Sequence, residues 1–151
     1  MNLEMQPRTV VILMAEDNPT DVMLTREALD DTELLHTLHV VKNGIEVMAF
    51  LCQQGKHANA PRPDIILLDL NMPRKNGLEV LAEIKTDMKL KNIPVIVLTT
   101  SNSLAEIVKV HANHADCYMV KPVDIDDFTL LIQSVRVLCC QAVTPPIHSE
   151  H

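Results

Sequence analysis

Polar side chains stand at the ends of several apolar runs in this chain, and their types suit phosphoryl chemistry. Glu16 and Asp17 follow the first run, and Asp69 lies at the end of the third. Thr99 lies at the end of the fourth run, and Lys121 follows the fifth. Three carboxylates can bind a cation, while a hydroxyl and an ammonium can bind anionic phosphoryl oxygens. These groups act together only if the fold brings the ends of the runs to one place.

The order of the elements predicts such a fold. Five apolar runs alternate with segments of helical periodicity, and they occupy 9–15, 36–41, 64–70, 94–100 and 117–120. The last helical segment follows at about 128–138. Alternating strands and helices are typical of an α/β protein whose parallel sheet is covered by helices on both faces.

Asparagine marks the predicted starts of three helices, in the pairs Asn18-Pro19, Asn43-Gly44 and Asn76-Gly77. The segment 53–63 is polar, contains one glycine and two prolines, and predicts a long loop.

Composition bounds the function. The 151 residues suit a single domain, which we expect at 8–140 between flexible termini at 1–7 and 141–151. A formal net charge of −7 argues against nucleic-acid binding through a basic face. No apolar run approaches the roughly 20 residues of a membrane helix. The four cysteines form no CxxC pair, and the early apolar stretch at 10–15 does not resemble a secretory signal, so we expect reduced thiols in a cytoplasmic protein. We also expect that the protein does not bind membranes.

The three carboxylates predict a metal site. In an open parallel sheet, ligands bind beyond the carboxyl ends of the strands. Three carboxylates within about 5 Å repel by roughly 3 kcal/mol per pair at an effective dielectric of 20. A cation relieves that repulsion, and oxygen ligands favour Mg²⁺ over zinc. The Asp69 carboxylate would then be a nucleophile that forms an aspartyl-phosphate.

Four motifs occur together in this chain, at Glu16-Asp17, 69–77, Thr99 and Lys121-Pro122. As a set they resemble the receiver domain of two-component response regulators, over about residues 8–140. The resemblance implies a flavodoxin-like five-stranded parallel sheet of order 2-1-3-4-5. It also implies a phosphorylation-switched signalling module rather than an enzyme. Because the sequence ends near the last helix, we expect no DNA-binding output domain.

The resemblance also implies the residues of the metal site. Asp69 would accept a phosphoryl group from a sensor histidine kinase. Asp17, Asp69 and the backbone carbonyl of Asn71 would bind Mg²⁺, and Glu16 would bind it through water.

Three further residues take roles from the same resemblance. Thr99 and Lys121 would hold the phosphoryl oxygens. Tyr118 fits the aromatic position that turns inward when Thr99 moves.

A narrower resemblance is to the small regulators paired with cyanobacterial phytochromes, which would make the kinase a phytochrome. It rests on residues 16–21, the loop ending at Asp64, and Val123-Asp124. Related chains often carry Phe-Trp-Leu near the end of the last helix, where this chain carries Leu138-Cys139-Cys140. We therefore expect a monomer, or a weak homodimer through 128–140.

Other functions have weaker support. A Mg²⁺-dependent phosphatase with an aspartate nucleophile typically carries a second aspartate two residues on, where this chain has Asn71. A nucleotide-binding flavodoxin-like domain lacks a glycine-rich phosphate loop here. A zinc site at His111, His114 and Cys117 lacks a fourth ligand nearby.

Overall fold

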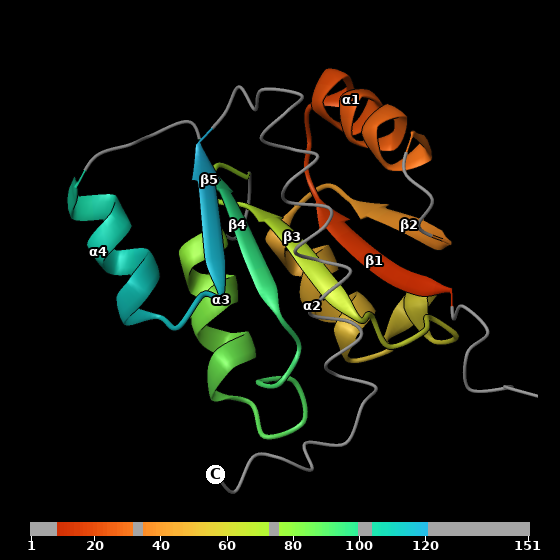
Figure 1. Ribbon diagram of the computed structural model, residues 1–151. Helices are drawn as coiled ribbons and strands as arrows, with labels where there is room; N and C mark the ends of the chain where they lie inside the picture. Colours follow the sequence, from red (N-terminus) through yellow and green to blue (C-terminus); the bar gives the residue numbers. More distant parts are fainter. Residues whose placement is uncertain (1–8, 32–34, 73–75, 100–103, 121–151) are drawn as a thin grey trace, which may run out of the picture.

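The computed structural model describes residues 9–31, 35–72, 76–99 and 104–120, and it forms one parallel sheet. Its five strands have the order β2-β1-β3-β4-β5 that was predicted (Figure 1). The strands are β1 (Val10–Ala15), β2 (His36–Val41), β3 (Ile65–Asp69), β4 (Val95–Thr99) and β5 (Cys117–Val120). Every residue of β3 and β4 is buried, as expected for strands covered on both faces.

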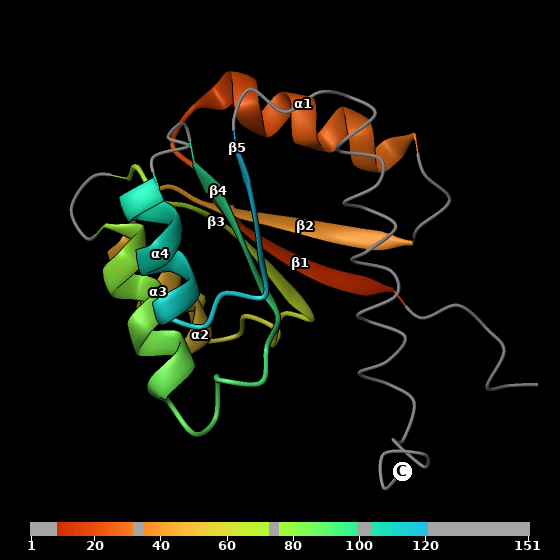
Figure 2. The same cartoon turned by 60° about the vertical axis from the view of Figure 1, so that its left-hand side comes forward.

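Helices cover both faces of this sheet, as Figure 2 shows most clearly. They are α1 (Pro19–Asp30), α2 (Gly44–Leu51), α3 (Gly77–Thr86) and α4 (Leu104–Ala112). One apolar core joins α1 to one face through Leu29. The other core joins α2, α3 and α4 to the opposite face through Phe50, Leu81 and Val110. The fold thus has three layers, and none of its described helices is long and apolar enough to span a membrane.

Asparagine caps fix where the helices begin, as the sequence predicts. The Asn18 side chain accepts hydrogen bonds from two backbone N–H groups at the start of α1, where Pro19 follows. Asn43 caps α2 in the same way. Asn76 forms a capping box with Glu79 at the start of α3.

The segment 53–63 is not entirely irregular. It contains η2 (Gly55–His57), a 3-10 turn that was not predicted. Gln53, two residues before the turn, and Gly55, its first residue, have positive φ angles of 56° and 59°. Glycine adopts a positive φ at little cost, whereas at Gln53 the same conformation costs about 1–2 kcal/mol. Composition alone does not reveal either backbone conformation.

The amino ends of the strands are joined by a compact polar network. Lys85 Nζ lies 3.0 Å from Asp116 Oδ2 and 2.9 Å from the carbonyl oxygen of Ile93. The same Asp116 oxygen accepts the N–H of Val95 at 2.8 Å. This network ties α3 to the starts of β4 and β5. The predicted last helix and the predicted domain limits lie outside the described residues.

Candidate functional site

An acidic cluster of Glu16, Asp17 and Asp69 stands at the carboxyl end of the sheet. Neighbouring strands β1 and β3 are in register with Ala15 opposite Leu68. The residues that follow this pair are Glu16 and Asp69, so the register brings them level with each other. One carboxylate oxygen from each member of the cluster lies within 4.8 Å of the others. The sequence-based prediction that these three carboxylates meet is confirmed.

The members of the cluster differ sharply in exposure. Glu16 is 1% exposed and Asp69 is 2% exposed, whereas Asp17 faces solvent. Backbone N–H groups stabilise the two buried carboxylates: that of Asn18 lies 3.3 Å from Glu16 Oε2, and that of Asn71 lies 3.0 Å from Asp69 Oδ1. At 4.8 Å, two carboxylates repel by about 1 kcal/mol in water and about 3 kcal/mol at an effective dielectric of 20. The cluster therefore favours a cation.

Close packing of α3 positions the phosphoacceptor candidate. The N–H of Gly77 donates to the carbonyl oxygen of Leu70 at 3.1 Å. A Cβ atom at Gly77 would lie 2.6 Å from Leu70 Cα and 2.8 Å from the Asp69 carbonyl oxygen, both backbone atoms. Only glycine fits there without moving the loop. In the sequence, Asn76-Gly77 indicates a helix start, and nothing in the pattern reveals this contact.

Thr99 ends the strand next to Asp69. Asp69 is paired with Leu98, so Thr99 lies one residue farther toward the carboxyl end of the sheet. Thr99 is almost fully buried, with 1% of its surface exposed. Thr99 thus stands beside the acidic cluster, at the place where its hydroxyl was predicted to act.

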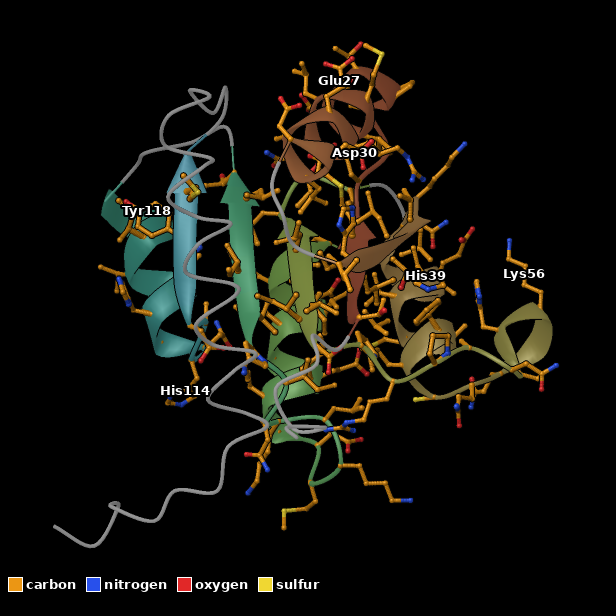
Figure 3. All side chains as sticks on the ribbon, turned by 45° about the vertical axis from the view of Figure 1, so that its right-hand side comes forward. Glu27, Asp30, His39, Lys56, His114 and Tyr118 are labelled. Carbon is orange, nitrogen blue, oxygen red and sulfur yellow. The ribbon has the colours of Figure 1, made fainter. Side chains whose placement is uncertain are left out.

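Tyr118 lies in β5 opposite Val97 of β4. Both belong to the face that packs against α2, α3 and α4, and alternation along β4 puts Thr99 on that face too. The Tyr118 ring, labelled in Figure 3, also contacts the His111 ring of α4. The two ring centroids are 6.3 Å apart and the ring planes meet at 82°. Nothing in the sequence pattern indicated this pair.

The predicted site is thus placed in part. Glu16, Asp17 and Asp69 meet, Asn71 is hydrogen-bonded to Asp69 through its backbone, and Thr99 is adjacent. Lys121 lies outside the described residues. Among those the structure describes, no second group of three acidic, histidine or cysteine side chains could hold a metal ion.

The sequence matches one protein family over most of its length. A model of the response regulator receiver domain matches residues 12–133. This chain is a member of that family. The receiver domain was the family indicated by the motifs, and the flavodoxin-like order of its sheet agrees with it.

Several known receiver domains are similar over almost their whole length. Response regulator Rcp1 of Synechocystis sp. is 43% identical over 136 residues, which are 90% of this chain and 92% of the relative. The solved structure of a phosphorylated cyanobacterial phytochrome response regulator, RcpA, superposes with a TM-score of 0.80 at 41% identity, covering 92% of this chain and 99% of RcpA. The Mn²⁺-bound form of Rcp1 superposes with a TM-score of 0.78 at 42% identity, covering 91% and 99%.

Proposed function

We propose that this receiver domain accepts a phosphoryl group on Asp69 from a histidine kinase and signals through contacts of its own surface. The observation that carries the proposal is the acidic cluster, in which a nearly buried Asp69 stands at the end of β3 beside two more carboxylates. A carboxylate held by a fixed backbone N–H and crowded by like charges is suited to metal-assisted attack on phosphorus.

Mg²⁺ fits this cluster by the chemistry of its donors. Hard oxygen ligands, with one or two carboxylates and room for water, are what Mg²⁺ prefers. Asp17, Asp69 and the Asn71 carbonyl would bind the ion directly, and Glu16 through water. When bound, it would neutralise charge on the phosphoryl oxygens.

The transfer itself requires little from the protein beyond position. An Asp69 oxygen donates an electron pair to phosphorus, and the bond from phosphorus to the kinase histidine breaks. The departing nitrogen keeps that electron pair and takes a proton from water. The Thr99 hydroxyl and the Lys121 ammonium would donate hydrogen bonds to the transferred oxygens.

A phytochrome is the kinase that we propose as partner. Support comes from the phytochrome response regulator RcpA, which is similar over 92% of this chain. A kinase must also reach Asp69 from outside. Met23 and Leu24 of α1 are 51% and 53% exposed, and α1 begins two residues after Asp17. Exposed apolar side chains next to the site offer a contact surface for that partner.

Self-association is part of the same proposal. We propose that the protein is a monomer, or a weak homodimer through 128–140, where Leu138 and Cys139 stand in place of the Phe and Trp that related chains often carry. Smaller side chains bury less area at an interface.

Labelling with acetyl phosphate tests the acceptor. The wild-type protein should take up at most one phosphoryl group per chain, only with Mg²⁺, and Asp69→Asn should take up none. Asp30→Asn, which changes an exposed carboxylate whose Oδ1 lies 3.6 Å from His36 Nε2, is the matched control and should label normally. Equal labelling of Asp69→Asn would overturn the proposal. Repeated turnover of a phosphomonoester by the pure protein would favour the phosphatase instead.

Phosphotransfer from a panel of histidine kinases, red-light sensors among them, tests the partner. We expect the fastest transfer from a phytochrome kinase. Leu24→Glu should slow that transfer while labelling by acetyl phosphate continues at the wild-type rate. Equal rates from all kinases would contradict a phytochrome partner but not the role of Asp69.

A further inference from the structure

The contact between His111 and Tyr118 is the most specific feature that the proposed phosphotransfer leaves unexplained. The two rings come from different elements, α4 and β5, and meet edge to face. Their centroid separation of 6.3 Å lies within the range in which aromatic pairs attract beyond their buried area. Figure 3 shows the Tyr118 ring on the side of β5 that faces α4.

The topology determines from which side His111 reaches this ring. Helix α4 connects two parallel strands, so it runs antiparallel to them, and its last turn lies near the amino end of β5 (Figure 1). His111 is the second-last residue of α4. Thr99 stands at the opposite, carboxyl end of β4. His111 therefore approaches Tyr118 from the side away from Thr99 and the acidic cluster.

We infer that His111 is a positioning residue that holds the Tyr118 ring away from Thr99 in the unphosphorylated protein. This inference rests on the proposed function and on the role that the resemblance to receiver domains implies for Tyr118, whose ring would turn inward when phosphorylation moves Thr99. The ring cannot move toward Thr99 and also keep its contact with a side chain on the far side. His111 thereby favours the resting state and sets how readily the domain switches.

The consequence is a change in a two-state equilibrium. Removing a contact that exists in only one state shifts the populations toward the other. An aromatic contact of this kind is worth a factor of about 2 to 12 in that ratio. If the inward state is the minor one, the apparent affinity for a phosphoryl mimic rises by up to the same factor.

The chain offers a clean probe, because Tyr118 is the only tyrosine and there is no tryptophan. Acrylamide quenching of tyrosine fluorescence then reports the exposure of this one ring, with and without Mg²⁺ and beryllofluoride. His111→Ala removes the contact, and His111→Phe keeps an aromatic edge in the same place. His114→Asn is the control, since it removes a nearby exposed imidazole at φ 66°, which asparagine tolerates.

We expect His111→Ala to raise the inward-to-outward ratio of Tyr118 about 2- to 12-fold without beryllofluoride, and to lower its half-saturating concentration. His111→Phe and His114→Asn should behave like the wild-type protein. Quenching of unphosphorylated His111→Ala equal to wild type, or the same change in His114→Asn, would overturn the role of His111 while the proposed function stands. Failure of Asp69 to label would instead overturn the proposed function, which the measurement on the unphosphorylated protein does not use.

Discussion

At the scale of single residues, the acidic cluster combines two mostly buried carboxylates, Glu16 and Asp69, with one that faces water. Glu16 and Asp69 are held by backbone N–H groups, whereas Asp17 is exposed. An exposed carboxylate can exchange water for a metal ion without any rearrangement of the core. Asp17 is therefore the member of the cluster whose charge can be removed at least cost to packing.

Asp17→Asn should weaken Mg²⁺ binding and yet stabilise the metal-free fold. Its amide ends the repulsion with Glu16 and Asp69, which for an exposed group is worth about 1 kcal/mol. Urea unfolding in the presence of a chelator measures this stability, and Mg²⁺ titration measures affinity. Glu27→Gln, another exposed carboxylate outside the cluster, should change neither. A less stable Asp17→Asn protein would show that the three charges do not repel appreciably in the folded state.

At the scale of elements, the contact between Gly77 of α3 and Leu70, which follows β3, does most to position the phosphoacceptor Asp69. A Cβ atom at Gly77 would meet the Leu70 Cα and the Asp69 carbonyl oxygen, which are backbone atoms of both residues in the Asp69–Leu70 pair. A helix packed this closely leaves the phosphoacceptor little freedom, and that rigidity is part of how the site is positioned.

Gly77→Ala should therefore destabilise the fold by about 1–3 kcal/mol through overpacking and also slow the labelling of Asp69. Gly55→Ala is the matched control: it places alanine at φ 59° with no atom within 4 Å, at a cost of about 1–2 kcal/mol. Both variants should unfold at lower denaturant concentration, but only Gly77→Ala should label slowly. Equal labelling rates for the two would mean that the close contact does not position Asp69.

The elements also show how far the sequence predicts the structure. The fully buried strands β3 and β4 are predictable because burial on both faces demands uninterrupted apolar runs. The meeting of Glu16 and Asp69 follows from the parallel register of β1 and β3. The turn η2 is not predictable in this way, because it depends on backbone angles at Gln53 and Gly55. The Gly77 contact and the His111–Tyr118 pair depend on how separate elements pack, which periodicity does not encode.

At the scale of the whole molecule, the domain must signal through its own surface if no output domain acts for it. The segment 128–140 is the one predicted from the sequence to mediate self-association. The phosphoryl-binding role of Lys121 and the dimer contact through 128–140 remain predictions, because these residues lie outside the described part of the chain. Phosphorylation would then act by shifting the equilibrium between weakly associated states.

Sedimentation under reducing conditions should show a monomer, or a dimer in fast exchange, that tightens with Mg²⁺ and beryllofluoride. Cys139→Trp combined with Cys140→Leu should strengthen association, since aromatic side chains often dominate interface energies. Reductant removes dimers made by thiol cross-links. A tight dimer of the unphosphorylated wild-type protein under these conditions would refute the weakened interface.

The most direct test of the account locates the phosphoryl group within the chain. The wild-type protein is phosphorylated with acetyl phosphate and Mg²⁺, the acyl phosphate is reduced with borohydride, and the digested peptides are sequenced by mass spectrometry. Borohydride converts a phosphorylated aspartate to homoserine, which marks the position permanently. If Asp69 is the phosphoacceptor, homoserine should appear at Asp69 and nowhere else, and none should form when Mg²⁺ is chelated. Homoserine at Asp17 instead of Asp69 would contradict this assignment. So would the absence of homoserine from a sample that had taken up a phosphoryl group.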